Sequence, residues 1–332
     1  MMSESNRKLV ELISKNFTVN QIAEEMNLSH KQLYYRLFLL KNDGFDFKSN
    51  YYSNAETKLE MKKFADVFDQ DGNTNCTDLI TQKGNSSLRT LIISDIHKCN
   101  NSENAYCLDK IYDYCIDHNI HIILNCGDLI EGVGSIGGNP TTSDIFEQIN
   151  SFISDYPFDK NILNFVVLGN HDTHPLNQNG QNFKTILENQ RRDIIPIGYK
   201  QAILNVKDDR IVMNHHIDNM PNFFQKSTVN LFGHSHKFEL KSSVNSLSIS
   251  VPSLSNINYY KDKFCMPQAL DVTFKFSNKY ISGIDLIQLL INEDNPMILS
   301  ESSVQLNNQR NKNHKDQFLE VDNLPKTKVR IK

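Results

Sequence analysis

The sequence predicts an α/β fold of two sheets preceded by a small all-α domain, and three observations support this prediction. From Thr90 onward, short apolar runs rich in β-branched residues alternate with helical segments, which is typical of buried parallel strands covered by helices. Later runs follow one another through shorter connections, which favours a second, partly antiparallel sheet. Residues 6–42 carry apolar side chains at helical spacing instead. The 332 residues suit one large domain and one small domain.

Composition narrows the class of protein further. Hydrophobic residues make up 39% of the chain and aromatic residues 9%, which is enough for a packed core. The formal net charge of −4 provides no global basic field, so any contact with nucleic acid must be local. No apolar run is long enough to span a membrane, and the polar N-terminus lacks the pattern of a secretory signal. None of the six cysteines forms a CxxC pair, and we expect a cytoplasmic protein.

The N-terminal segment predicts three short helices. The first covers "NRKLVELISKNF", the second is capped by Thr18, and the third opens at Ser29 and ends near Gly44. This arrangement resembles a helix-turn-helix, and the weak alternation that follows predicts a two-stranded wing. No acidic residue lies between Asn27 and Asn42, which makes the basic side chains of the third helix candidate DNA contacts: His30, Lys31 and Arg36.

A protein-binding or dimerisation module remains an open alternative for this segment. Residues 1–62 hold nine Lys and Arg against eight Asp and Glu, a balance that does not favour DNA. We predict a domain over residues 1–62, a polar linker over 63–88 and the large domain over 89–306. The tail, 307–332, holds seven Lys and Arg against three Asp and Glu, and we expect its end, "PKTKVRIK", to be mobile.

In the large domain, the pattern of apolar residues predicts strands and helices in the following order along the chain. The first three strands cover residues 90–95, 121–128 and 162–170, separated by helices near 104–118 and 142–154. Six further runs complete the strand prediction: "KQAILNV", "RIVMNHH", "TVNLFGHSH", "SLSISV", "ALDVTFKF" and "YISGIDLIQLL". This order is that of a parallel sheet followed by a mixed one.

Metal-binding residue types gather where these apolar runs end. Five groups occur within about 140 residues: "DIH" (Asp95, His97), "GD" (Asp128), "GNHD" (Asn170, His171, Asp172), "HH" (His215, His216) and "GHSH" (His234, His236). Because the carboxyl ends of parallel strands share one edge of a sheet, we expect these groups to converge on one site. A single group of this kind is weak evidence for a metal site, but the ordered set of five groups is specific evidence for one.

The chemistry of the set indicates two divalent cations. Imidazoles with carboxylates and without cysteine suit Mn, Fe, Co, Ni or Zn rather than a thiolate site. The donors exceed the need of one ion, so two ions about 3.5–4 Å apart, bridged by a carboxylate, are the economical arrangement. Asp128 is the natural bridge, since it stands alone after its strand and follows Gly127, which lets the backbone come close.

The ordered set resembles the calcineurin-like metallophosphoesterases over residues 89–251, about half of the chain. The resemblance implies a two-sheet αββα sandwich and assigns Asp128 as the bridge. It assigns the first ion to Asp95, His97 and His236. It assigns the second ion to Asn170, His234 and one of two adjacent histidines, of which the apolar "IVM" run favours His215 over His216. Alternate residues after a strand point apart, so His234 and His236 need not serve one ion.

The resemblance also implies roles near the substrate. His171 would act as a general acid or hydrogen-bond donor at the phosphate, with Asp172 orienting it. His216 and Glu131 are candidate substrate contacts, although Glu131 equally suits a ligand-orienting or helix-capping role. Leu168 stands where family protein phosphatases have arginine, and "GDLIEG" replaces their GDxVDRG segment, so this subclass is not expected.

These features predict a dinuclear-metal phosphoesterase, with Mn as the expected metal and a phosphodiester in nucleic acid or a nucleotide as the expected substrate. Two alternatives stay open: a DNA-binding regulator whose phosphoesterase-like domain senses a ligand, and a small-molecule phosphatase whose N-terminal helices dimerise. No membrane partner is expected. The combination of segments resembles bacterial or phage proteins.

Overall fold

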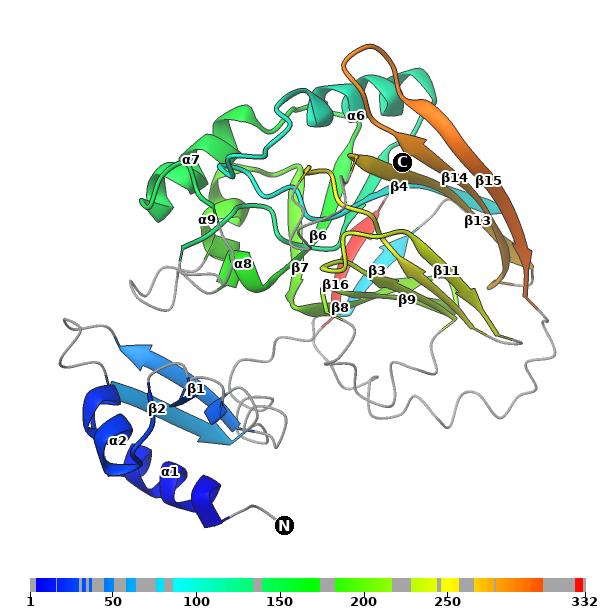
Figure 1. Ribbon diagram of the computed structural model, residues 1–332. Coiled ribbons are helices and arrows are strands. Elements are labelled where there is room, and N and C mark those ends of the chain that lie inside the picture. The colour runs from blue at the N-terminus through cyan, green and yellow to red at the C-terminus, as the bar shows by residue number, and fades with distance from the viewer. Residues whose placement is uncertain are drawn as a thin grey trace. The chain divides into compact units, whose positions relative to one another are not determined.

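The computed structural model divides the chain into a unit that runs to Asn73 and a larger unit that begins at Thr74 (Figure 1). The described residues are 4–15, 17–29, 32–33, 36–37, 45–50, 58–63, 76–80, 86–133, 139–173, 183–216, 228–243, 246–256, 266–277, 279–306 and 326–330.

The N-terminal unit contains helices α1 (Glu4–Ser14) and α2 (Val19–Glu25), and an antiparallel pair of strands, β1 (Phe45–Asn50) and β2 (Lys58–Lys63). The helix α2 begins with a capping box, because the backbone N–H of Gln21 donates to Thr18 Oγ1 and the N–H of Thr18 donates to Gln21 Oε1. Ser29 and Gln32 make the same reciprocal contacts, and the described residues after them are helical. The predicted starts of the second and third helices are thus capped as their sequences indicate.

A small apolar core holds these helical segments together. Its buried members are Leu9, Leu12, Ile13, Val19, Ile22, Ala23, Leu33 and Leu37. Among the predicted DNA contacts, Arg36 is partly buried, whereas His30 and Lys31 lie outside the described residues. Such a core serves a DNA-binding domain and a dimerisation module equally well.

The first sheet of the large unit has the strand order β15-β14-β13-β4-β5-β6-β7. Its parallel half consists of β4 (Ser87–Ile93), β5 (Ile122–Asn125), β6 (Leu163–Leu168) and β7 (Ile194–Tyr199). Its antiparallel half consists of β13 (Gln268–Ser277), β14 (Tyr280–Leu290) and β15 (Met297–Gln305). The three predicted strands that open the domain are confirmed as β4, β5 and β6.

The second sheet is mixed, in the order β11-β12-β10-β9-β8-β3-β16. Its strands are β3 (Cys76–Ile80), β8 (Gln201–Val206), β9 (Asp209–Asn214), β10 (Val229–Phe232), β11 (Glu239–Ser242), β12 (Leu247–Ser250) and β16 (Lys326–Arg330). β9 and β10 are parallel neighbours, so the groups that follow them emerge at one edge. The predicted second, partly antiparallel sheet is therefore confirmed.

Two apolar cores define the layers of the large unit (Figure 1). Helices α6 (Tyr106–Asp117), α7 (Ile145–Asp155) and α9 (Phe183–Gln190) pack their buried side chains with those of the first sheet. The second core lies between the two sheets and includes Ile92, Phe165 and Met213. Among the described residues of the large unit, α6, α7 and α9 all pack on the first sheet, so the outer helix layer expected for the second sheet is not among them.

Two expectations about polar segments are corrected by the structure. The segment 63–88, expected as a linker, contributes β3, which pairs in parallel with β8 and buries Thr77 and Leu79. The tail, expected to be mobile, contributes β16, which pairs in parallel with β3. Both strands are short and lack a clear apolar pattern, since β3 reads "CTDLI" and β16 reads "KTKVR", so their pairing rather than their hydropathy reveals them.

Candidate metal centre

The five predicted groups converge at the carboxyl ends of β4, β5, β6, β9 and β10. Three sets of side chains each bring possible ligand atoms within 4.8 Å of one another: Asp95, His97 and His236; His97, Asp128 and His171; Asp128, His215 and His234. His97 and Asp128 each occur in two sets, so the sets form one connected cluster. This is the placement expected where strand ends share an edge.

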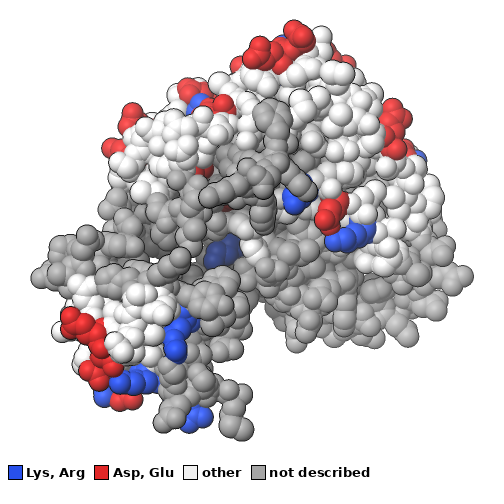
Figure 2. Space-filling view, in the orientation of Figure 1, with Lys and Arg blue, Asp and Glu red and all other residues white. Residues whose placement is uncertain are grey.

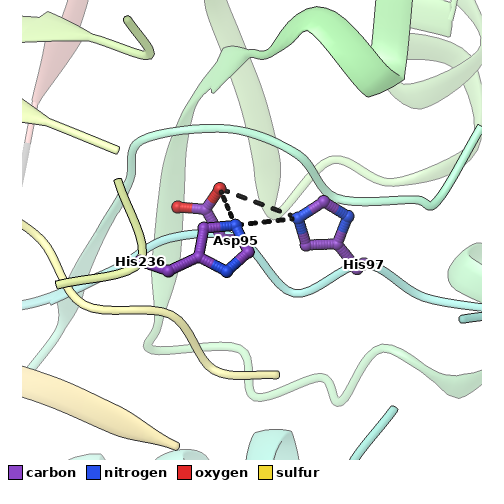
Figure 3. A group of neighbouring side chains, drawn as sticks. All are labelled: Asp95, His97 and His236. Atoms are coloured by element: carbon purple, nitrogen blue, oxygen red, sulfur yellow. Dashed lines mark hydrogen bonds and ion pairs between the residues drawn. The ribbon is translucent and has the colours of Figure 1, made fainter. Parts of the chain in front are cut away.

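One end of the cluster is built by Asp95, His97 and His236, which face one another in Figure 3. His236 Nε2 lies 3.2 Å from Asp95 Oδ1, and His97 Nε2 lies 3.7 Å from the same oxygen. The two imidazole nitrogens are 3.4 Å apart. Three donor atoms thus point at a common volume, from the loop after β4 and the loop after β10.

Asp128 joins the two ends. Its Oδ2 lies 2.9 Å from His215 Nε2 and 3.8 Å from His97 Nε2, while its Oδ1 accepts the backbone N–H of His171 at 2.9 Å. One carboxylate oxygen therefore faces a histidine of each end. This is the position that a bridging ligand requires.

Several buried donor atoms fit a divalent cation. Among the described residues, the buried Asn170 Oδ1 has no hydrogen-bond partner, and the buried Asp95 Oδ1 and His215 Nε2 have only the ion-pair contacts given above. Burying polar atoms without hydrogen bonds is unfavourable unless another partner compensates. Imidazole nitrogens, carboxylates and a carboxamide oxygen, without thiolate, are a donor set for first-row divalent metals. The residues present therefore fit the cations that the sequence predicts.

Hydrogen bonds behind the cluster set the tautomers of two histidines. His215 Nδ1 donates to the backbone carbonyl of Cys126 at 2.8 Å, and His97 Nδ1 lies 3.0 Å from Glu131 Oε2. Because a carbonyl or carboxylate oxygen can only accept, each Nδ1 carries a hydrogen, and Nε2 is the nitrogen of each ring that can bind a cation once its proton is displaced. Glu131 is fully buried, so the structure gives it a ligand-orienting contact rather than the predicted substrate contact.

Comparison with known proteins decides the family. The sequence profile described as Calcineurin-like phosphoesterase matches residues 88–258, just over half of the chain. The chain belongs to the calcineurin-like phosphoesterase family. A search of curated proteins gives no match. As a member of this family, the protein is a phosphoester hydrolase by descent, and its Asp and His cluster is a divalent-metal site.

Solved structures with a similar fold include several proteins of low sequence identity. Vacuolar Protein Sorting 29 from Cryptosporidium parvum is 12% identical, with a TM-score of 0.41, over 67% of this chain and 100% of that one. A novel archaeal phosphodiesterase is 16% identical, with a TM-score of 0.41, over 61% and 100%. GAP50 of Plasmodium, the anchor in the inner membrane complex, is 11% identical, with a TM-score of 0.44, over 74% and 98%.

No helix among the described residues is long and apolar enough to cross a membrane.

The backbone at the phosphoesterase centre is left-handed at five of the candidate ligands. The values of φ are +55° at Asp95, +51° at His97, +54° at Asp128, +64° at His234 and +57° at His236. Non-glycine residues seldom adopt this region, and clusters of them occur where surrounding contacts hold a functional geometry. His234 falls in the set with Asp128, and His236 in the set with Asp95. The positive φ values, rather than strand alternation, direct these two side chains apart.

Adjacent charges set the protonation of the metal-free cluster. Burial opposes a charged imidazole, but Asp95 and Glu131 raise the pKa of His97 to about 10. Asp128 likewise raises the pKa of His215 to about 9 against the effect of burial. For His234 burial acts together with the charges of the neighbouring histidines and lowers its pKa to about 4. A cation must therefore displace protons from His97 and His215, as metal binding generally does.

His171 and Asp172 lie at the N-terminus of the short helix α8 (Asn170–Thr173), both buried. The His171 ring contacts the backbone carbonyl of Glu131 through Nδ1 at 2.5 Å. Asp172 instead accepts the backbone N–H groups of Leu129, Ile130 and Gly169. Burial and the charge of Asp128 raise the pKa of Asp172 to about 7, against these hydrogen bonds. The prediction that Asp172 orients His171 is corrected: Glu131 makes that contact, and Asp172 ties two loops together.

The two adjacent histidines after β9 have different surroundings. His215 is 1% exposed and faces Asp128, whereas His216 is partly exposed and its ring centre lies 4.3 Å from that of His234. His216 belongs to none of the three sets of ligand atoms. The geometry therefore favours His215 as the ligand.

Sequence reasoning also overlooked Gln148, a buried side chain beside the centre, because nothing in its local pattern distinguishes it.

Gly169 provides a test of how tightly the centre is packed. A Cβ at this position would lie 2.1 Å from Asp128 Oδ1 and 2.7 Å from the Asp128 backbone nitrogen, so Asp128 would have to move. We expect Gly169→Ala to weaken metal affinity by about 10- to 100-fold, the range seen when ligand positioning is lost. Isothermal titration with Mn²⁺ measures this. Gly283→Ala, on β14, is the matched control: its Cβ would lie 2.5 Å from the backbone oxygen of Val304 on β15, and neither strand carries a ligand, so the affinity should stay unchanged.

Proposed function

We propose that this protein is a dinuclear-metal-dependent phosphoesterase that cleaves a phosphodiester in nucleic acid or in a nucleotide. The observation that carries the proposal is the position of Asp128, whose Oδ2 faces His215 on one side and His97 on the other. A single-ion site would need no such shared oxygen. Family membership supplies the reaction class, and the paired sites supply the dinuclear character.

The proposed ligands divide between two ions. Asp95, His97, His236 and Asp128 hold the first, and Asp128, Asn170, His215 and His234 hold the second. When bound, the ions supply Lewis-acid charge and lower the pKa of a bound water toward neutrality. Mn is the expected metal, and the donor set also suits Fe, Zn, Ni and Co.

His171 is the proposed proton donor to the leaving oxygen. Its Nδ1 contacts a carbonyl oxygen, which can only accept, so Nδ1 carries a hydrogen and the proton transfer is assigned to Nε2. His216, next to His234 and partly exposed, is the proposed contact to the substrate.

The activity is tested with bis-p-nitrophenyl phosphate and p-nitrophenyl phosphate in the presence of Mn²⁺. We expect metal-dependent release of p-nitrophenolate, faster from the diester and abolished by a chelator. The proposal would be contradicted if hydrolysis continued at a similar rate after the chelator is added. It would also be contradicted if none of the five metals supported hydrolysis. Faster hydrolysis of the monoester would support a metal-dependent phosphoesterase but would contradict the proposal that its substrate is a phosphodiester.

We further propose that the N-terminal unit binds DNA through its third helix. Two basic residues of the first helical segment pair with acids, Lys8 with Glu25 at 3.3 Å and Lys15 with Glu11 at 2.6 Å. Figure 2 shows both signs of charge on the described surface of this unit. The candidate contacts are the basic residues of the predicted third helix, His30, Lys31 and Arg36.

Loss of DNA affinity in the double variant Lys31→Ala/Arg36→Ala is the expected result. If each residue contacts a phosphate, the salt slope of binding falls by about 1 for each, as measured by mobility shift of the whole chain at several salt concentrations. Lys8→Ala, on a helix with paired charges, is the control. Binding without any hydrolysis would favour the regulator, whereas no binding and a concentration-dependent mass would favour a dimerisation module.

A further inference from the structure

Gln148 is a fully buried carboxamide in the middle of α7. Its neighbours on the buried face of the helix are apolar, among them Ile145, Ile149 and Phe152. An amphipathic helix normally fills such a position with an apolar residue, because burying a polar group is unfavourable unless its hydrogen bonds are replaced. Gln148 therefore calls for an explanation other than packing.

The hydrogen bonds of Gln148 go to the loop that follows β5. Its Oε1 accepts the backbone N–H of Gly132 at 2.8 Å. Its Nε2 donates to the backbone carbonyl of Gly132 at 3.1 Å and to that of Thr142 at 2.8 Å. Gly132 belongs to neither sheet, so the side chain supplies the pairing that a neighbouring strand would otherwise give.

The peptide unit that Gln148 contacts also contacts His171. The N–H of Gly132 and the carbonyl of Glu131 are the two ends of one planar peptide group. Gln148 Oε1 accepts from the first end, and His171 Nδ1 donates to the second. Hydrogen bonds in such a series polarise one another, so the bond to Gln148 makes the carbonyl of Glu131 a better acceptor.

The packing around Gly132 leaves this peptide group little freedom. Gly132 has a φ of +71°, and a Cβ there would lie 2.5 Å from the backbone oxygen of His171. On the other side, the N–H of Glu131 donates to the carbonyl of Lys98 at 2.9 Å. A tilt of the peptide group would move the Glu131 carbonyl away from the His171 ring.

We propose that Gln148 is a positioning residue for His171, which it controls through the Glu131–Gly132 peptide group. The carboxamide holds the plane of the peptide, the peptide carbonyl holds the hydrogen on Nδ1, and Nε2 thereby faces the reaction. The inference rests on the proposed function of His171 as proton donor. It extends the phosphoesterase centre to α7, which carries no metal ligand.

The test compares two variants of Gln148 with two controls on the same helix. Gln148→Met keeps the length and removes every hydrogen bond, and Gln148→Glu, protonated when buried, can still accept from Gly132 and donate to a carbonyl. We expect Gln148→Met to lower kcat by about 10- to 100-fold, the cost of a misplaced catalytic group, with KM and Mn²⁺ affinity unchanged. Gln148→Glu should recover most of this loss.

The controls separate positioning from stability. Asn150→Met makes the same chemical change at an exposed position of α7 and should leave kcat unchanged. Ile149→Ala removes a buried side chain of α7 and should lower the melting temperature while leaving kcat unchanged at a temperature where the protein is folded. If Ile149→Ala reduces kcat as much as Gln148→Met, or if folded Gln148→Met keeps full kcat, the proposal fails.

A second measurement needs no catalysis. Long-range ¹H–¹⁵N correlation spectra of the Zn²⁺-loaded protein report the tautomer of each histidine, and the His171→Gln variant assigns the signal. We expect the Nδ1–H form of His171 in the wild type and a mixture of forms in Gln148→Met. If the wild type hydrolyses no phosphate ester yet shows this change, the phosphoesterase proposal fails and the positioning contact stands. If hydrolysis is present and the tautomer is the same in both proteins, the positioning proposal alone fails.

Discussion

Asp128→Ala is expected to abolish metal-dependent hydrolysis. Among the described residues of the centre, Asp128 is the one carboxylate with an oxygen, Oδ2, that faces a histidine proposed for each of the two ions. Its loss removes a proposed ligand from each ion at once, and with them a Lewis-acid contribution of several kcal/mol, which corresponds to about 10³-fold or more in kcat. Titration with Mn²⁺ should show less than one ion bound at concentrations that saturate the wild type.

Two further variants make this result interpretable. Asp128→Asn keeps the size of the side chain and an oxygen that can accept the N–H of His171, so it should fold normally and still lose metal. Asp271→Asn alters another buried carboxylate, whose side-chain hydrogen bonds go to Arg89 and Tyr114 and to none of the proposed ligands. That variant should lose stability and retain two ions. Two ions bound to Asp128→Ala would rule out the bridging role.

His171→Ala is expected to bind both ions normally and to lose about 10²- to 10⁴-fold in kcat, the usual contribution of a general acid. The side chain contacts Glu131 and its backbone contacts Asp128, but its ring is assigned to the substrate rather than to a metal. Metal analysis of the purified variant and titration with Mn²⁺ measure the first half of this prediction, and steady-state kinetics measure the second.

The choice of substrate sharpens the test of His171. A p-nitrophenolate leaving group departs without protonation, whereas the alkoxide of a dinucleotide needs a proton. The loss in kcat should therefore be larger for a dinucleotide than for bis-p-nitrophenyl phosphate. His121→Ala, at an exposed histidine outside the centre, should leave both rates unchanged. Equal losses on both substrates would show that His171 acts other than as a proton donor.

The sequence allowed most of the large domain to be predicted, because buried parallel strands are strongly apolar. The runs that became β4, β5 and β6 end in the residues that meet at the centre, and strand-end convergence is a general property of such sheets. The strands β3 and β16 were missed, since short strands in polar segments owe their form to partners elsewhere in the chain.

Roles that depend on side-chain direction were harder to predict than positions. Asp172 adjoins His171 in sequence, yet α8 turns its carboxylate onto the backbone of Leu129 and Gly169. Gln148 looks like any polar residue of a helix, and only the folded arrangement shows that it meets the loop after β5. Neither contact has a local sequence pattern, so the three-dimensional structure was needed to find them.

The pairing of β16 with β3 has a consequence for the order in which this protein folds. β3 is among the first strands of the large unit to be synthesised, and its outer partner is synthesised after every other strand of both sheets. Contacts so distant along the chain form slowly, since the intervening segment must first be brought together. During translation one side of β3 therefore stays open to pairing with other chains, and a nascent protein held at high concentration is most exposed to aggregation there.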